Sequence, residues 1–207
     1  MYARSSTIAA RLSSIDSGIA YLRDEVMPSM SEIEGWVGMS LMAERTSGRC
    51  IAATAWETEA AMQASRGRVQ SLRGDLAQAL GGQVELVEEW EIAVMHRDHP
   101  ADFGACARCT WVQSDPGKID RLIDTFKMGV LPEAEMINGF CSASLFIDRA
   151  TSRAVASTVW ASPEAMDNSR EQTDRLRKAA TGRAGANVLE VAEFELAFAH
   201  LRVPEMA

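Results

Sequence analysis

The feature that most constrains this chain is an internal repeat. Shifted by 104 positions, the 207-residue sequence aligns with itself without a gap, and about 30 of 103 aligned positions are identical. Chance would give roughly a fifth of that number. The clearest matches are VMPSMSEIEGW with VLPEAEMINGF, TAWETEAAMQASR with TVWASPEAMDNSR, and VELVEEWEIAVMH with VLEVAEFELAFAH. The repeat indicates tandem duplication of a unit of about 100 residues, a normal domain size.

The repeat also predicts where the chain divides. Pro100 and Gly104 lie among short polar residues, which is typical of a linker. We therefore predict a first unit at residues 1–98, a linker at 99–104 and a second unit at 105–207.

Each copy is expected to run in the order strand, helix, two strands, helix, strand. In the first copy the predicted strands are 2–9, 35–44, 49–56 and 84–97, and the helices 14–30 and 58–79. In the second copy they are 105–113, 140–148, 153–160 and 188–200, with helices from about 114 to 132 and from 162 to 180. A βαββαβ unit is ferredoxin-like, with helices on one face of an antiparallel sheet. The fold class is α+β.

Local signals mark the helix ends and the free face of the sheet. Ser114-Asp115-Pro116 predicts an N-cap followed by Pro in the first turn, and Thr58 and Ser162 are the predicted caps of the second helices. Pro132 is expected to end or bend its helix. Along residues 89–94 apolar side chains alternate with Glu89, Glu91 and Ala93, so the face opposite the helices is only partly polar. A partner sheet would cover it, and the other copy supplies one.

Composition excludes several classes of protein. The chain is 47% apolar and 24% charged, with a net charge of −8, and this balance argues against a nucleic-acid binder. The N-terminus has no continuous apolar signal region, and no stretch is long enough to span a membrane. We expect a cytoplasmic protein without membrane contact. The four cysteines are expected to be small buried thiols.

The two copies resemble the antibiotic biosynthesis monooxygenase (ABM) domains of the dimeric α/β-barrel superfamily. The resemblance rests on a Pro before a Gly-aromatic pair and on a Trp-x-Ser/Thr-x-Glu-Ala-Met-like segment. In the first copy these are Pro28, Gly35-Trp36 and residues 56–62, and in the second Pro132, Gly139-Phe140 and residues 160–166. The resemblance implies that the two units form one barrel within the chain, as a monomer or within a higher homo-oligomer.

The family resemblance also implies an activity. Members include oxygenases that use no cofactor, so it implies a monooxygenase acting on a small hydrophobic, aromatic or polyketide-like compound, with neither metal nor flavin. Haem-degrading members carry an Asn on the first strand and a Trp and His on the second helix. Here the helix positions hold Ser65 and Asp75 in one copy and Ser169 and Ala179 in the other, and neither first strand has an Asn. Haem degradation is therefore not expected.

His96 and His200 occupy matching positions near the end of the last strand of each copy. A neutral imidazole can act as a base near pH 7, so these two are the candidate catalytic residues. The alternative is a structural hydrogen-bonding role at a strand end.

Aromatic side chains are the candidate ligand-binding residues. Those predicted to contact a ligand are Tyr21, Trp36, Trp56, Trp90, Phe140, Trp160 and Phe194. The alternative is packing, above all for the two Trp residues after the third strand, whose indole N–H groups would then find partners in the core.

Charged residues repeat as well. Glu89 and Glu91 match Glu193 and Glu195, and a carboxylate pair two residues apart on a strand could serve acid–base chemistry or a metal. Pairing with Arg4 and Arg108 across strands is the alternative, and we predict no metal site. The arginines repeated on the second helix are expected to form a solvated stripe: Arg66, Arg73, Arg170 and Arg177.

Three functions remain open from the sequence. Each unit should hold an apolar pocket between helices and sheet, which suits an oxygenase of the ABM type. A non-catalytic small-ligand-binding or stress-associated protein is the alternative, favoured by the lack of an evident polar triad shared by both copies. A purely structural protein would instead expose an apolar patch.

Overall fold

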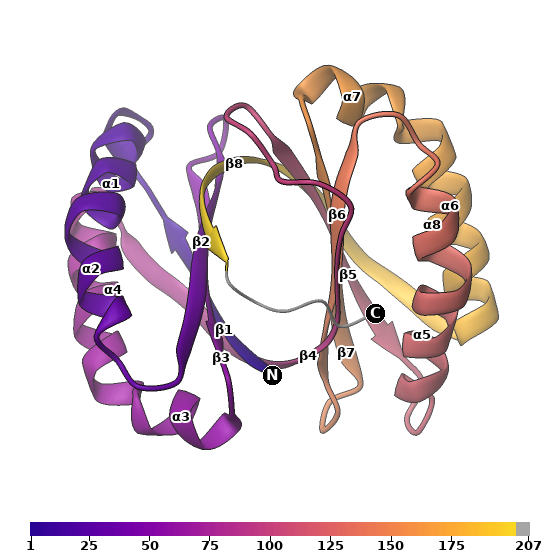
Figure 1. The fold of residues 1–207 in the computed structure, drawn as a ribbon, viewed down its shortest axis with the longest axis horizontal. Coiled ribbons are helices and arrows are strands. Elements are labelled where there is room, and N and C mark those ends of the chain that lie inside the picture. The colour runs from indigo at the N-terminus through magenta and orange to yellow at the C-terminus, as the bar shows by residue number, and fades with distance from the viewer. Residues whose placement is uncertain (202–207) are drawn as a thin grey trace. The chain divides into compact units, whose positions relative to one another are not determined.

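The computed structural model describes residues 1–201, and Figure 1 shows their elements. The first copy contains β1 (Tyr2–Ala9), η1 (Leu12–Ser14), α1 (Ile15–Tyr21), η2 (Leu22–Val26), α2 (Met27–Ser31), β2 (Trp36–Glu44), β3 (Arg49–Trp56), α3 (Glu59–Ala64), α4 (Arg66–Ala79) and β4 (Gln83–Arg97). The second contains β5 (Cys106–Ser114), α5 (Ile119–Thr125), η3 (Phe126–Val130), α6 (Leu131–Ala134), β6 (Phe140–Asp148), β7 (Arg153–Trp160), α7 (Pro163–Asn168), α8 (Arg170–Ala184) and β8 (Ala186–Leu201).

The strands follow the order β1-β3-β2-β8-β5-β7-β6-β4, and this order closes on itself as a barrel. The ladders of β1 with β3 and of β5 with β7 are antiparallel and have the same register after a shift of 104 residues. They run from Tyr2↔Trp56 in one copy and from Cys106↔Trp160 in the other. The predicted α+β class, with two ferredoxin-like units joined in one barrel, is confirmed.

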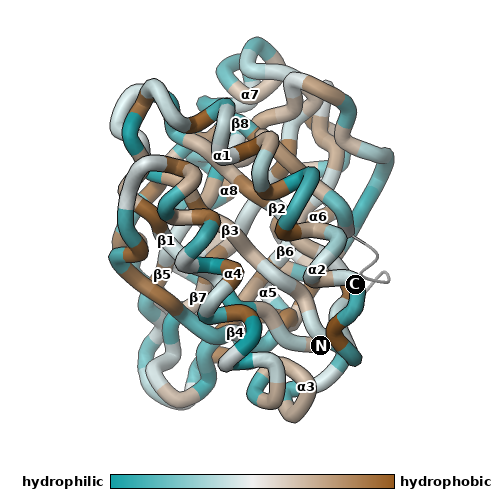
Figure 2. The backbone as a smooth tube through the Cα atoms, turned by 90° about the vertical axis from the view of Figure 1, so that its left-hand side faces the viewer, coloured by the Kyte–Doolittle hydropathy of each residue, from teal (hydrophilic) through white to brown (hydrophobic). Residues whose placement is uncertain are grey.

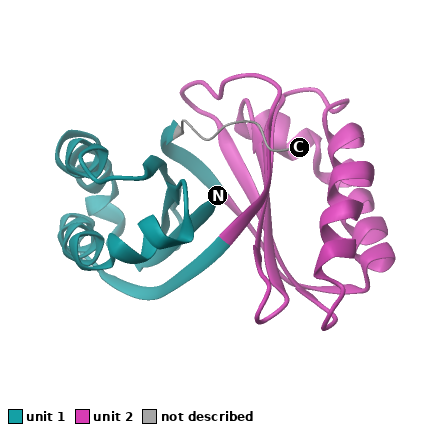
Figure 3. Cartoon of the chain, turned by 60° about the horizontal axis from the view of Figure 1, so that its bottom comes forward, with its two compact units in different colours: residues 1–90, 194–203 teal, residues 91–193, 204–207 magenta. Residues whose placement is uncertain are grey.

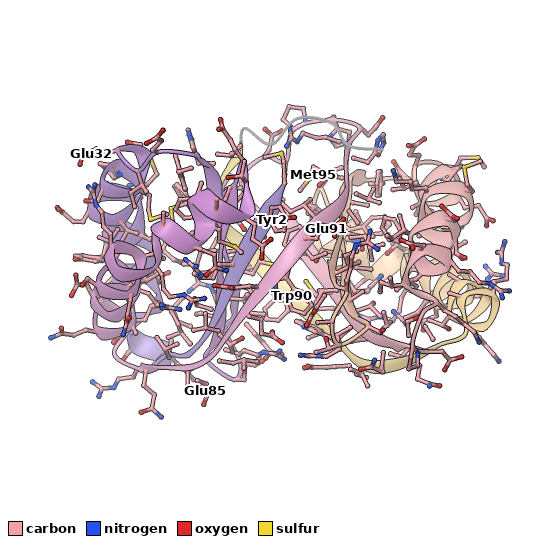
Figure 4. The ribbon with its side chains drawn as sticks, turned by 90° about the horizontal axis from the view of Figure 1, so that it is seen from below. Tyr2, Glu32, Glu85, Trp90, Glu91 and Met95 are labelled. Atoms are coloured by element: carbon pink, nitrogen blue, oxygen red, sulfur yellow. The ribbon has the colours of Figure 1, made fainter. Side chains whose placement is uncertain are left out.

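The chain packs into two compact units, and their limits fall inside β4 and β8 (Figure 3). One unit comprises Met1–Trp90 with the end of β8 from Phe194 onward, and the other comprises Glu91–Glu193. Trp90 and Glu91 are therefore consecutive residues of β4 assigned to different units (Figure 4). This division by packing differs from the division by repeat at residues 99–104, which stays a prediction about the duplication.

In both units the first helix contains a wide, π-helical turn just before a proline. The π turns are η2 and η3, and Pro28 and Pro132 follow them in α2 and α6. Proline has no N–H for the carbonyl four residues earlier, which lies inside the π turn in each case, so the helix widens there. The expected end or bend at Pro132 is thus a change of helix type, after which α6 continues.

Two of the three predicted helix N-caps are confirmed. The Thr58 and Ser162 hydroxyl oxygens accept hydrogen bonds from the N–H groups of Ala61 and Ala165, both at 3.1 Å, as N-caps do. The cap predicted at Ser114 is wrong, because Ser114 ends β5 and α5 begins at Ile119. Gly117, with a φ of +76°, forms a turn between them that the sequence pattern did not reveal.

Two glycines that carry the family resemblance are required by packing. Gly35 and Gly139 have φ values of +76° and +83°, and a Cβ on either would lie 2.5 Å from the Cβ of Ala61 or Ala165 on the following helix. Only glycine combines that conformation with so close an approach. The Gly-aromatic pair therefore sets the distance between the second strand and the second helix of each unit.

Each unit has its own core between helices and sheet. Apolar and polar residues alternate along the helices, as colouring by hydropathy shows (Figure 2). All four cysteines are buried free thiols, as expected, and burial raises the pKa of Cys50 to about 11. Among the described residues, no helix has the length and hydrophobicity to cross a membrane.

Candidate functional site

Each unit contains a cavity between its helices and its sheet, as predicted. The larger one, of about 90 Å³, lies in the unit formed by Glu91–Glu193. Its walls are mostly apolar and come from β5, β6, β7, α5, η3, α6 and α8. The lining residues are Arg108, Thr110, Val112, Leu122, Phe126, Val130, Ala134, Leu145, Ala156, Thr158, Thr173, Leu176, Arg177, Ala180 and Thr181.

The cavity of the other unit occupies the equivalent place but measures only about 30 Å³. It is lined by Arg4, Ser6, Val26, Met30, Met39, Ala52, Thr54, Val69, Leu72, Arg73 and Leu76. Leu76 and Met30 stand where the larger cavity has Ala180 and Ala134. These longer side chains fill space that is open in the second unit, so the two cavities have diverged in size.

A buried arginine lines the larger cavity. Arg108 on β5 is 3% exposed. Its Nε donates to Glu193 at 2.7 Å, its Nη1 to the Ser169 and Thr173 hydroxyls at 3.0 and 2.7 Å, and its Nη2 to the Met166 carbonyl at 2.7 Å. The carbonyl and Ser169 lie where α7 ends and α8 begins. Arg108 therefore joins the second helix to the sheet.

The smaller cavity repeats this arrangement. Arg4 on β1 donates to Glu89 at 2.8 Å, to the Met62 carbonyl at 2.8 Å and to the Ser65 hydroxyl at 3.3 Å. Burial opposes ionisation of Glu89, but hydrogen bonds from Arg4 and Gln63 outweigh it, so the pKa of Glu89 lies below its ordinary value. The Arg–Glu pairing across strands that we expected is confirmed for Arg4 and Arg108.

The pKa of Glu193 is lowered for the same reason. Its burial favours the neutral acid, and hydrogen bonds from Arg170 and Arg108 more than compensate. Each buried arginine thus faces a carboxylate that stays ionised down to acidic pH, which keeps the buried charges paired.

The tryptophans after β3 and β7 that were predicted to bind a ligand pack in the core, and their role in binding stays a prediction. Trp56 and Trp160 are fully buried, and their indole N–H groups donate to Thr54 and Thr158 at 3.1 Å. The two threonines do line the cavities. The tryptophans therefore contribute to the site by holding a hydroxyl in its wall.

The other predicted ligand-binding aromatics also lie outside these two cavities. Trp90 donates from its indole N–H to Ser5 at 2.9 Å, Phe194 packs under the guanidinium of Arg49, and Tyr21 packs on the core of its unit. Phe140 makes an edge contact with Trp160, and Trp36 stacks on His200. Their roles in binding stay predictions.

His96 and His200 lie at strand ends, where the sequence placed them, and neither lines the two cavities. His200 stacks on Trp36 with ring centres 5.7 Å apart. The Nε2 of His96 lies 2.6 Å from Glu135 and its ring faces Phe140. The catalytic role of either histidine remains a prediction.

The carboxylates two residues apart do not form a site. Glu89 faces Arg4, whereas Glu91 binds Arg149 at 2.7 Å in the other unit. Glu193 and Glu195 divide in the same way, with Glu195 bound to Arg45 at 2.5 Å. The strand passes from one unit to the other between the two carboxylates. Among the described residues, no group of three metal-ligating side chains gathers.

The solvated stripe expected on the second helix is wrong for two of its four arginines. Arg66 and Arg170 are exposed, but Arg73 and Arg177 turn inward and line the cavities. The sequence analysis found no evident polar triad shared by both copies, whereas the structure gathers a recurring polar set around each buried arginine. Arg, Thr, Ser and Arg recur as Arg4, Thr54, Ser65 and Arg73 and as Arg108, Thr158, Ser169 and Arg177. The arginines were recognised as repeated, but the identity of Thr54 with Thr158 and of Ser65 with Ser169 was a signal that sequence reasoning did not use.

Comparisons with known proteins find relatives that match this chain over its whole given length. The uncharacterized proteins Rv2557 and Rv2558 of Mycobacterium tuberculosis (strain ATCC 25618 / H37Rv) are each 50% identical to it. The alignments cover all of this chain and 92% and 87% of those proteins. No family model matches the chain.

Solved structures share the fold. A candidate monooxygenase from Lactobacillus acidophilus NCFM has a TM-score of 0.70 at 12% identity, over 97% of this chain and 96% of that one. An anthrone oxidase-like protein has a TM-score of 0.66 at 14% identity, over 100% and 95%. A ferredoxin-fold protein related to antibiotic biosynthesis monooxygenases, from Listeria monocytogenes 4b F2365, has 0.53 at 8%, over 95% of both chains. At these identities the likeness establishes the fold alone.

Proposed function

We propose that this chain, which belongs to the family of the Mycobacterium tuberculosis proteins Rv2557 and Rv2558, is a monooxygenase of the ABM type that needs no cofactor. Its substrate is a small hydrophobic or aromatic compound held in the larger cavity. The observation that carries the proposal is this cavity itself, whose mostly apolar lining also includes Arg108, Thr158, Thr173 and Arg177.

The volume of the cavity supports a small substrate. Its volume of about 90 Å³ is well below the roughly 300 Å³ at which sites for drug-sized ligands begin. We therefore favour a single-ring or short-chain compound over a polycyclic one. Phe126 and Val130, which lie in the π turn η3, form one wall. Such turns are frequent at functional sites.

The chemistry follows from the charged end of the cavity. In a reaction of this class, loss of a proton from an activated methylene group leaves a carbanion or enolate that reduces O₂. The methylene carbon loses four electrons as it is oxidised to a carbonyl. O₂ accepts these electrons, and one of its oxygen atoms becomes the carbonyl oxygen while the other leaves as water. Guanidinium groups such as Arg177 would stabilise the developing negative charge in a largely apolar site. His96 and His200 stay the predicted bases.

The non-catalytic ligand-binding protein is the second candidate. It is favoured by one observation, namely that neither histidine lines the two cavities. A binder would hold the same compounds in the same cavity without consuming O₂.

The decisive experiment measures oxygen uptake and binding together for a panel of single-ring enols, phenols and activated methylene compounds. We expect turnover that Ala180→Leu abolishes, because leucine fills the equivalent place in the smaller cavity as Leu76. Ala179→Leu adds the same volume at the neighbouring exposed position of α8 and should leave uptake unchanged. Compounds that bind to the wild type without any oxygen consumption would replace the oxygenase with the binding protein.

A further inference from the structure

Arg73 is the one residue of the smaller cavity whose charge has no evident partner. It lies on α4 and lines the cavity with Arg4. Its Nη1 atom is buried and makes no hydrogen bond with any described residue. A buried guanidinium nitrogen without an acceptor is unfavourable, because its N–H groups have lost water and gained nothing.

The charges around Arg73 do not balance. Glu89 is the carboxylate within reach of its charge, and that carboxylate already accepts hydrogen bonds from Arg4, Arg66 and Gln63. Burial, and next the positive charge of Arg4, lower the pKa of Arg73, while Glu89 opposes them. The end of the cavity therefore carries more positive than negative charge.

The second unit shows how the same position is neutralised. Arg177, the equivalent of Arg73, forms an ion pair with Asp174 three residues earlier on α8. In the first unit that position holds Gln70, which has no charge. The absence of a neutralising carboxylate is thus specific to the smaller cavity and follows from one residue.

We propose that the smaller cavity is a binding site for a small monovalent anion, of the size of acetate or a halide, held by Arg73. The cavity of about 30 Å³ has room for about two waters or a few heavy atoms. Its anion would supply at Arg73 the charge that Asp174 supplies at Arg177. The two duplicated units would then have divided their roles, one cavity taking an anion and the other an apolar compound.

This site is independent of the oxygenase proposal, because binding is measured without turnover. The first test follows the midpoint of thermal unfolding, Tm, in sodium acetate, bromide and tosylate at constant ionic strength. A ligand that binds only the folded protein raises Tm with its concentration. We expect acetate and bromide to raise Tm in the wild type, and tosylate, which exceeds the cavity, to have no such effect.

Two matched variants assign the effect to Arg73. Gln70→Asp places a carboxylate three residues before Arg73, in the position that Asp174 has relative to Arg177. This variant should bind acetate at least tenfold more weakly than the wild type in calorimetric titration. Asp174→Asn removes the partner of Arg177 in the other unit and should leave the site at Arg73 intact. Equal acetate affinity in the wild type and Gln70→Asp would overturn the proposal.

A crystal of the wild-type protein soaked in bromide gives a readout that does not depend on any variant folding. We expect an anomalous peak within hydrogen-bonding distance of the Nη1 of Arg73. A water molecule at that position, with no bromide in the cavity at any concentration tested, would overturn the proposal, as would binding at exposed arginines alone.

Discussion

Arg4 and Arg108 show how a charged side chain becomes part of a core. Each is almost fully buried and donates to one carboxylate, one serine hydroxyl and one main-chain carbonyl. A buried charge is tolerated when it is paired and its remaining donors are satisfied. Both conditions are met because Ser65 and Ser169 sit at the junction of two helices, where each hydroxyl donates to the Met62 or Met166 carbonyl at 2.7 Å while hydroxyl and carbonyl both accept from the arginine.

These pairs predict how stability depends on pH. Glu89 and Glu193 have pKa values below their ordinary 4.5 in the folded chain. Their stabilising contribution is therefore complete above about pH 4.5 and is lost as the pH falls through the lower folded values. We expect the double variant Glu89→Gln, Glu193→Gln to be less stable at pH 6 and to lose less stability than the wild type between pH 5 and pH 3.

The measurement is the free energy of unfolding in urea across that pH range. Glu85→Gln and Glu190→Gln alter exposed carboxylates of the same two strands, and they serve as the control. If the free energy of unfolding of the Glu89→Gln, Glu193→Gln variant fell as steeply between pH 5 and pH 3 as that of the wild type, these pairs would not govern acid stability.

At the scale of the element, the second helix of each unit is divided by a serine. α3 and α4 meet at Ser65, and α7 and α8 meet at Ser169. The sequence pattern predicted one continuous helix in each place, because apolar spacing continues through the junction. The break matters for the site, since it provides the carbonyl and the hydroxyl that hold the buried arginine.

The caps of these helices predict a local effect on stability. Thr58→Ala and Ser162→Ala each remove a hydroxyl oxygen that accepts a hydrogen bond from the backbone N–H three residues later in the chain. We expect each to reduce the free energy of unfolding by about 1 kcal/mol, as is usual for N-caps. Glycine at the same positions should cost only a few tenths of a kcal/mol. Chemical unfolding of the four variants checks this, and unchanged stability of Thr58→Ala and Ser162→Ala would contradict the role of the two caps.

At the scale of the whole molecule, the compact units do not coincide with the copies of the repeat. The first unit is completed by the end of β8, from Phe194 onward, which pairs with β2. The second is completed by the end of β4, whose residues from Glu91 pair with β6. Each copy thus contributes the last half of its final strand to the other unit.

This exchange predicts the behaviour of isolated copies. A fragment of residues 1–98 lacks the strand that pairs with β2 and has an unpaired end of β4. We expect it to associate with itself, or to remain unfolded, and to form a 1:1 complex with a fragment of residues 99–207. Light scattering after size exclusion and far-ultraviolet circular dichroism provide the measurements. A stable, folded monomer of residues 1–98 would contradict the expectation.

Much of the fold follows from the sequence by itself. The repeat, the alternation along the strands and the caps at Thr58 and Ser162 are local or periodic signals, and they predicted the βαββαβ order and the bounds of β2, β3, β6 and β7 closely. The cavity between helices and sheet in each unit was predicted as well, since an amphipathic helix layer over a sheet defines where it must lie.

Only the tertiary structure decided which side chains reach that cavity. Arg73 and Arg177 look like solvated helix residues in the sequence, because a helix face is assigned from apolar spacing and both lie beside it. They point inward because the guanidinium group is long enough to reach the cavity beside Arg4 or Arg108. The aromatic residues chosen from the sequence lie outside the two cavities, and their roles in binding stay predictions. Sequence periodicity determines the layers, whereas the length of each side chain and the partners it meets determine the site.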